Sequence, residues 1–147
     1  MFRGTHQHSM DSKGRLSVPA RFREHLEQSC GGQMVLTIDR DHCLTAYPLP
    51  QWEEIERKLA EMSSTDPIVR KFQRLFVGYA EELALDAQGR VLISPTLRGF
   101  AQLEKQVILV GQMRKFEIWD QGRWDQYQRE SLASLADDFS HLGEITL

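Results

Sequence analysis

The chain has 147 residues, of which 41% are hydrophobic and 27% charged, and its formal net charge is −3. This length accommodates one average domain or two small ones. Because the chain has no run of 18 apolar residues and no basic stretch leading into an apolar one at its N-terminus, we expect neither a membrane span nor a signal peptide, and we expect a cytoplasmic protein.

The first expected elements are two strands joined by a tight turn. Met10 lies on the incoming strand, Asp11 to Gly14 form the turn, and Leu16 and Val18 alternate with polar residues on the outgoing strand. An aspartate can accept hydrogen bonds from the backbone amides that follow it, and glycine readily adopts the positive φ of such turns. These features predict a β-hairpin.

A short helix is predicted after Pro19, because proline lacks the N–H that the first turn of a helix leaves unpaired. Phe22 and Leu26 share one face of this helix. Strands are expected next, at residues 34 to 38 and 43 to 47.

Two further helices are predicted before the middle of the chain. The first opens at Trp52 and has apolar residues at helical spacing: Trp52, Ile55, Leu59 and Met62. The second begins at Asp66 and Pro67, an N-cap followed by a first-turn proline, and its expected inward face is Ile68, Phe72, Leu75 and Phe76. Its outer face carries Arg70, Lys71 and Arg74, which fit a solvated face better than the alternative of an accessory basic strip.

The second half of the chain begins with the same kind of turn. Leu83 and Leu85 lie on the strand before a turn at Asp86 to Gly89, and Val91 and Ile93 lie on the strand after it. The remaining expected elements are a short helix after Pro95, strands at 107 to 110 and 116 to 119, and a helix from near Trp124 to about Ala136.

The two halves repeat each other. Asp11-Ser12-Lys13-Gly14-Arg15 recurs as Asp86-Ala87-Gln88-Gly89-Arg90, and in each half an aromatic residue precedes a tryptophan by five positions, Tyr47 before Trp52 and Trp119 before Trp124. The copies are offset by roughly 72 to 76 positions, which identifies a tandem repeat. We predict a first repeat at 1–62, a bridging helix at 63–78, a second repeat at 79–125, and a C-terminal helix with an acidic tail at 126–147.

The repeated turn carries the chemistry. An arginine on a tight turn presents a planar fork of donors that fits guanine O6 and N7 in the major groove, or a phosphate. Arg15 and Arg90 are therefore the leading candidates for DNA contacts. Gly14 before the first arginine would let the backbone approach a duplex closely. Asp11 and Asp86 are expected to support the turns; a structural Asp–Arg pair without any ligand is the alternative.

The two copies are expected to contribute unequally. Lys13 in the first turn corresponds to Gln88 in the second, which is uncharged. Arg3 is close enough in sequence to join the same basic face. Arg21 and Arg23 lie on or near the first helix, where arginine is as often solvated as bound to phosphate, so they rank below the turn residues.

The charge of the chain is segregated by position. Residues 1 to 23 carry Arg3, Lys13, Arg15, Arg21 and Arg23 against Asp11, a net of +4. Residues 120 to 147 carry six acids against two arginines, a net of −4. Because the local potential at a contacting face attracts nucleic acid, the overall negative charge does not exclude a DNA-binding function.

These motifs resemble the MraZ family, bacterial transcriptional regulators of the division and cell wall gene cluster. The residues that carry the resemblance are Met1 to Gly4, Asp11 to Arg23, Gln33 to Val35, Tyr47 to Pro50 with Trp52, Asp86 to Arg98, Leu109 to Gln112 and Phe116 to Asp120. The resemblance implies an α+β fold of two tandem AbrB-like swapped-hairpin β-barrel repeats, which form a pseudo-two-fold unit with flanking helices.

The same resemblance implies a function. Members of the family form closed rings and act as repressors of their own operon, binding direct repeats of a short guanine-rich box. We therefore expect double-stranded DNA as the partner, a ring-like homo-oligomer and association with the nucleoid. Small apolar units that cover each other or neighbouring chains are physically consistent with self-association.

No metal, cofactor or small-molecule substrate is expected. Cys30 and Cys43 lack the C-x-x-C spacing of a zinc ribbon, and a disulfide between them is improbable in a reducing compartment. His6 and His8 fall on one side of a strand and could chelate a metal, but such pairs are more often coincidence.

Two other classes of function compete with DNA binding. An enzyme is disfavoured because the chain has no G-x-S-x-G, H-E-x-x-H, P-loop or dinucleotide-binding motif. A ring-forming scaffold for a protein partner is supported by the net acidity and the tryptophans. A gel-shift with an upstream DNA fragment and excess nonspecific DNA separates a sequence-specific DNA binder from both.

Overall fold

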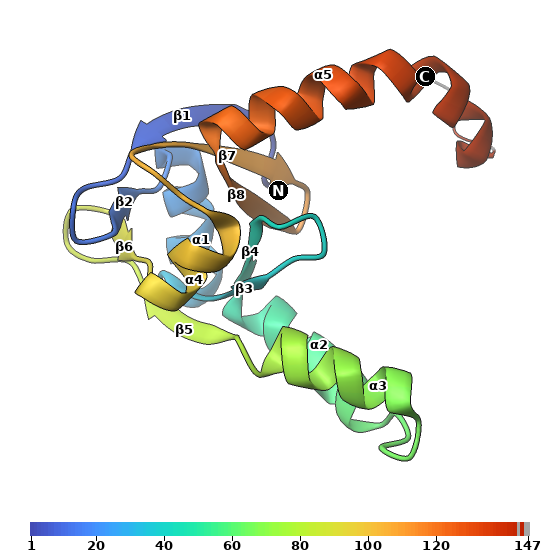
Figure 1. Ribbon diagram of the computed structural model, residues 1–147. Helices are drawn as coiled ribbons and strands as arrows, with labels where there is room; N and C mark the ends of the chain where they lie inside the picture. The colour runs from blue at the N-terminus through green and yellow to red at the C-terminus, as the bar shows by residue number, and fades with distance from the viewer. Residues whose placement is uncertain (144, 146–147) are drawn as a thin grey trace.

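The computed structural model describes residues 1–143 and 145 and has a mixed α+β fold (Figure 1). In chain order the elements are β1 (Thr5–Ser9), β2 (Arg15–Ser17), α1 (Ala20–Cys30), β3 (Gln33–Ile38), β4 (Leu44–Pro48), α2 (Leu49–Ala60), α3 (Pro67–Phe72), the π-helical turn η1 (Gln73–Val77), β5 (Glu81–Ala84), β6 (Arg90–Leu92), α4 (Pro95–Ala101), β7 (Gln106–Gln112), β8 (Lys115–Asp120), α5 (Gln121–Asp138) and the 3-10 turn η2 (Phe139–Leu142).

The strands form two antiparallel sheets. One has six strands in the order β1-β7-β8-β4-β3-β5, and the other consists of β2 paired with β6. The six-stranded sheet is open, with β1 and β5 at its edges, so the expectation of a closed β-barrel is wrong. The strands β2 and β6 are three residues each and pair with one another, so they do not join the two edges.

The two halves of the chain exchange strands. β1 from the first half pairs with β7 from the second, and β5 from the second half pairs with β3 from the first. At the centre of the large sheet β4 pairs with β8. The order of the large sheet therefore has the same form from either edge, a pseudo-two-fold arrangement of the two halves.

Both predicted tight turns are present, and Met10 forms an antiparallel bridge with Leu16 across the first, but the strands β1, β2, β5 and β6 that flank the turns have their ladders with other partners. In the first turn the Gly14 N–H donates to the Asp11 carbonyl at 3.0 Å. In the second half, Leu83 of β5 pairs with Met34 of β3. The predicted hairpin pairing of the Leu83 and Leu85 strand with the strand after Gly89 is therefore wrong, because β6 pairs with β2 of the other half.

The core draws on both halves. Leu16 and Val91 lie opposite each other in the β2–β6 ladder, and both are buried. The largest core cluster combines side chains from the two repeats, among them Phe2, Phe22, Leu26, Leu36, Leu97, Leu109, Phe116 and Ile118. Each repeat thus completes the apolar core of the other.

The two helices predicted after the prolines are confirmed. α1 follows Pro19 and buries Phe22 and Leu26. α4 has Pro95 in its first turn, and the Ser94 hydroxyl caps it by accepting a hydrogen bond from Leu97 N–H at 3.2 Å. Both helices cover the core beside the β2–β6 pair.

The repeated aromatic spacing corresponds to a repeated ring contact. Tyr47 packs on Trp52 at 5.7 Å between ring centroids, and Trp119 packs on Trp124 at 5.4 Å. The helices themselves begin three residues before each tryptophan, at Leu49 and at Gln121. Met62, predicted on the apolar face of the helix from Trp52, is exposed beyond the end of α2.

The bridging helix has its predicted cap but a different inward face. The Asp66 carboxylate accepts from Ile68 N–H at 2.9 Å. Ile68, Phe72 and Leu75 are exposed, so the predicted inward face is wrong for these three. The inward stripe lies one residue further on: Val69 is buried, the Gln73 side chain donates to the Leu59 carbonyl at 3.2 Å, and Phe76 packs on Trp52 at 5.2 Å.

α5 leaves the body of the molecule as a long arm (Figure 1). Asp120 caps it, accepting from Arg123 N–H at 3.3 Å, and the helix continues to Asp138, two residues past the predicted end. Residues 144, 146 and 147 of the predicted acidic tail lie outside the described residues. Within the described part of the chain, no helix combines the length and apolar character needed to cross a membrane.

Candidate nucleic-acid interface

The two repeated turns share one hydrogen-bonding pattern. One carboxylate oxygen of Asp11 accepts from the backbone N–H groups of Lys13 at 3.0 Å and Arg15 at 2.9 Å. In the second turn Asp86 accepts from Gln88 and Arg90 N–H, both at 2.9 Å. Each aspartate therefore fixes the backbone that leads into its arginine, as the sequence predicts for a turn-supporting residue.

The other oxygen of each aspartate holds the arginine side chain. Arg15 Nε lies 2.6 Å from the Asp11 carboxylate, and Arg90 Nε lies 3.0 Å from that of Asp86. The backbone and side-chain hydrogen bonds from Arg15 lower the pKa of Asp11 to about 2. The pKa of Asp86 is lowered for the same reasons. Both carboxylates are thus ionised at neutral pH.

Arg15 and Arg90 lie on one face of the two-stranded sheet. Arg15 is opposite Leu92 and Arg90 is opposite Ser17, and strand alternation places all four side chains on the face away from the buried Leu16–Val91 pair. Diagonal neighbours in an antiparallel pair are about 7–8 Å apart at Cα. The fold therefore brings the two predicted DNA-contacting arginines together, although they are 75 positions apart in sequence.

The turn glycines are required by the packing of one repeat on the other. Gly14 has φ of +91°, and a Cβ there would lie 2.6 Å from the Ile93 carbonyl oxygen and 2.9 Å from Arg98 Nε. Gly89 has φ of +73°, and its Cβ would meet the side chain of Arg23. Packing between the repeats therefore accounts for a glycine at position 14, independently of the predicted close approach of the backbone to DNA.

Arg23, ranked below the turn residues on sequence, and Arg98, not proposed as a site residue, both pack on the turns. The Arg98 guanidinium donates to the Ile93 carbonyl at 3.0 Å and covers Gly14 of the opposite turn. Arg23 donates to the Gln88 carbonyl at 3.4 Å and covers Gly89. Each follows its own turn arginine by eight positions, so the repeat contained a signal for their shared role. They hold the two turns against each other.

The two turns differ in the side chain that precedes the glycine. Lys13 is exposed beside Arg15. Gln88 turns back, and its side-chain oxygen accepts from Arg90 Nη2 at 2.9 Å. One edge of the Arg90 guanidinium is therefore already used, and its side chain is less exposed than that of Arg15, 29% against 37%.

The other predicted basic residues lie elsewhere. Arg3 is exposed at the far end of β1, where its neighbour Phe2 pairs with Met113, so it does not join the turns. Arg21 is exposed on α1. The strip on α3 and η1 lies across the molecule from β2 and β6 (Figure 1), and its Arg70 donates to the carbonyls of Ser64 and Thr65.

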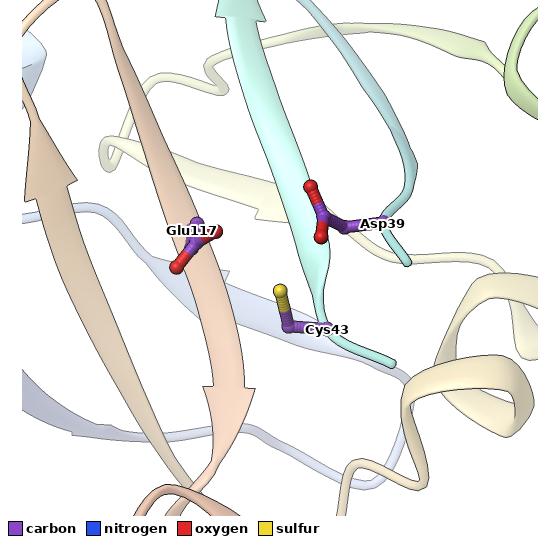
Figure 2. Close-up of side chains that lie close together, drawn as sticks. All are labelled: Asp39, Cys43 and Glu117. Carbon is purple, nitrogen blue, oxygen red and sulfur yellow. The ribbon is translucent and has the colours of Figure 1, made fainter. Parts of the chain in front are cut away.

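A polar cluster of two buried residues and the half-buried Asp39 joins the two repeats where β4 lies beside β8. Figure 2 shows Asp39 and Cys43 from the β3–β4 turn beside Glu117 from β8. One ligand atom from each of the three lies within 4.8 Å of the other two. Trp119 Nε1 donates to Glu117 at 3.0 Å, and the Thr45 hydroxyl donates to Asp39 at 3.1 Å.

These three donors are the set in the described residues that could hold a metal ion, and they do not include His6 or His8. Burial raises the pKa of the Cys43 thiol and of Glu117. A thiol must lose its proton to bind a metal. With both carboxylates already accepting hydrogen bonds, the geometry favours a structural link between the repeats over a metal centre.

Comparison with known proteins points to one family. The family described as "MraZ protein, putative antitoxin-like" matches residues 1–75 and 76–142. The protein named transcriptional regulator MraZ from Acidithiobacillus ferrooxidans is 59% identical over 152 residues, which cover 100% of both chains. The proteins of that name from Escherichia coli and Methylococcus capsulatus are 54% and 48% identical, covering 90% and 99% of this chain and 88% and 99% of their own.

Proposed function

Because the chain belongs to the MraZ family, we propose that it is a sequence-specific DNA-binding transcriptional regulator whose two Asp-x-x-Gly-Arg turns read guanine-rich DNA. Relatives named transcriptional regulators support the broad function. The observation that carries the finer proposal is the shared face of Arg15 and Arg90 on the β2–β6 pair.

The aspartates prepare each arginine for recognition. Each carboxylate binds Nε, so the Nη groups of Arg15 can point outward as a fork of donors. Such a fork matches O6 and N7 of guanine, and each bidentate contact contributes about 1–3 kcal/mol of discrimination. In this proposal Arg15 and Arg90 contact bases, while Lys13 contacts phosphate and Gln88 orients Arg90.

We further propose that the protein represses its own division and cell wall operon as a ring bound to promoter-proximal direct repeats. A ring carries the same turns on every subunit, so several weak contacts add through effective concentration. Direct repeats in DNA match subunits joined head to tail. The protein would then act in the cytoplasm, on the nucleoid.

A gel-shift tests this proposal. The probe is the DNA upstream of the protein's own gene, and the control is the same fragment with every guanine-rich box scrambled, both with excess nonspecific DNA. We expect a shift with the native fragment that scrambling abolishes. Equal binding to both fragments would contradict sequence-specific recognition, and absence of binding would contradict the proposed function.

A further inference from the structure

The helical parts of the two repeats leave two apolar surfaces uncovered. The first, here called the groove, has a volume of about 330 Å³ and is lined chiefly by Ile68, Phe72, Leu75, Phe76, Ile38 and Phe100. Ile68 is 74% exposed, and Phe72 and Leu75 are each about half exposed. Large apolar side chains gathered on one exposed surface are typical of a binding site.

The second surface, here called the arm, is the segment Glu130–Leu142 at the end of α5 and in η2. Leu132, Leu135, Phe139 and Leu142 recur at helical spacing, and all four are at least 40% exposed. The first half of α5 is packed on the sheet, because the ring centroids of Tyr127 and Trp119 of β8 lie 4.9 Å apart. Beyond Ser131 every residue to Gly143 is exposed.

The two surfaces match in length and in charge. The exposed apolar residues of the groove wall span eight residues, from Ile68 to Leu75, and the stretch from Leu132 to Phe139 of the arm has the same length, about two helical turns. The arm contains three acidic residues and no lysine or arginine. The segment from 67 to 77, which forms one wall of the groove, contains three basic residues and no acid, and the charged residues that line the groove are Arg40 and Lys71 against Asp39, a net positive lining.

The arm cannot fill the groove of its own chain. α5 leaves the body near β8, whereas α3 lies at the opposite end of the molecule (Figure 1). The aromatic anchor of Tyr127 and Trp124 on Trp119 fixes the direction of the helix. An acidic amphipathic arm and a basic-walled apolar groove that do not meet within a chain are complementary between chains.

We propose that the arm of one chain docks in the groove of a second copy. The inference rests on the self-association in the proposed function and assigns the surfaces that produce it. Such an interface is heterologous: each chain offers one arm and one groove, and subunits joined this way form a ring when the rotation between neighbours closes. The strands β2 and β6, which begin at Arg15 and Arg90, lie away from α3 and from the end of α5 (Figure 1), so the interface leaves the turns free for DNA.

Complementation of two variants tests the proposal. Phe72→Glu damages the groove and leaves the arm intact, and Leu135→Glu damages the arm and leaves the groove intact. Light scattering after size exclusion should give each variant alone the mass of one chain. An equimolar mixture should give the mass of two chains. The intact arm of Phe72→Glu docks in the intact groove of Leu135→Glu, and the pair has no other intact arm or groove with which to add a third chain.

Controls keep the result interpretable. Met113→Glu places the same charge on an exposed apolar residue of the β7–β8 turn and should retain the wild-type mass. Thermal unfolding followed by circular dichroism checks the fold of each variant. Leu75→Glu and Leu132→Glu form a second pair should either first variant fail to fold.

Several outcomes would overturn the docking proposal: a wild-type monomer, either variant with the wild-type mass, or a mixture that stays at one chain. If Phe72→Glu loses assembly while Leu135→Glu keeps the wild-type mass, the groove binds some other surface of the second copy and not its arm. An assembled wild type that fails the gel-shift would instead remove the proposed DNA function and leave the docking intact.

Discussion

Arg15 and Arg90 occupy equivalent positions in the two repeats, but the guanidinium of Arg90 makes an additional hydrogen bond within its own turn. Gln88 accepts a hydrogen bond from Arg90 Nη2, whereas Lys13 beside Arg15 is exposed and adds a positive charge. We therefore predict that Arg15→Ala weakens specific DNA binding by about 1–3 kcal/mol for each engaged guanine contact. Arg90→Ala should weaken it less.

Fluorescence anisotropy with the upstream DNA measures both variants, across a salt series. Lys13→Gln should reduce the slope of log K against log salt by about 0.9 per engaged subunit, because one phosphate contact is lost, while leaving base preference unchanged. Equal losses for the two arginine variants, with an unchanged slope for Lys13→Gln, would mean that the two turns are equivalent readers.

The Asp11 carboxyl gives a second prediction at the scale of single residues. Its pKa is lowered to about 2, and the largest cause is the hydrogen bond from the backbone N–H of Arg15, ahead of the side chain. Alanine keeps that N–H. Arg15→Ala should therefore raise the pKa of Asp11 only part of the way to its ordinary value of 3.8.

Carbon-13 NMR of the side-chain carboxyl measures this titration. In the wild type the Asp11 signal should stay nearly constant from pH 5 to pH 3, and in Arg15→Ala it should begin to shift. Because the folded-state pKa lies below the unfolded one, the Asp11 contribution to stability is present above about pH 4 and is lost as the pH falls toward 2. A wild-type signal that titrates near 3.8 would contradict the hydrogen bonds from Arg15 to the Asp11 carboxylate.

At the scale of elements, local pattern predicted most helices and strands but not their partners. The repeated turn and the proline-started helices follow from backbone chemistry within a few residues. The pairing of β2 with β6 joins residues about 75 positions apart, and nothing in a three-residue strand specifies which partner it takes. The swapped arrangement therefore came from the family resemblance, and the open edges came only from the structure.

In the bridging helix, a polar residue on the buried face led to a wrong prediction of which face points inward. Gln73 occupies the middle of the buried stripe, where its side chain binds the Leu59 carbonyl. An apolar pattern therefore pointed to Ile68, Phe72 and Leu75, which are exposed. In the candidate site, the repeat identified both turns, but the packing role of Arg23 and Arg98 did not follow from the sequence, because Arg23 donates to Gln88 and Arg98 lies against Gly14, each in the opposite repeat.

The contact between the turns predicts an unequal response to added methyl groups. Gly14→Ala should destabilise the protein by at least about 1–3 kcal/mol, because the positive φ is strained for alanine and the Cβ meets the backbone oxygen of Ile93. Gly89→Ala should cost less, since its Cβ meets a flexible arginine side chain that can move.

Urea unfolding at constant m-value measures these differences. Gly99→Ala is the matched control, because Gly99 lies in α4 with no atom within 4 Å of the added Cβ, and it should stabilise the protein by about 0.5–1 kcal/mol. A Gly14→Ala protein as stable as the wild type would show that the turns are not packed as described.

At the scale of the whole molecule, strand exchange makes the two repeats one folding unit. β1 has no antiparallel neighbour within its own half, because its partner β7 comes from the second half. We predict that a fragment of residues 1–78 does not form a folded monomer. It should be unfolded, or should dimerise with β1 of each copy on β3 of the other, the position equivalent to β7.

Circular dichroism and light scattering on the fragment distinguish these states. Co-expression with residues 79–147 should restore a folded pair, since each half supplies the strands that the other lacks. A cooperatively unfolding monomer of residues 1–78 would contradict the shared core.

Because the two repeats are fused in one chain, the face that carries Arg15 and Arg90 need not be symmetric. A homodimer of a single repeat would have identical turns related by a true two-fold axis, so it would read a palindrome and every mutation would alter both readers. Here Lys13 corresponds to Gln88, and Ser17 corresponds to Leu92, so the reading face has a distinct head and tail. If the proposed function holds, a face with a distinct head and tail would recognise an oriented half-site, and either turn could evolve a new base preference while the other keeps the old one.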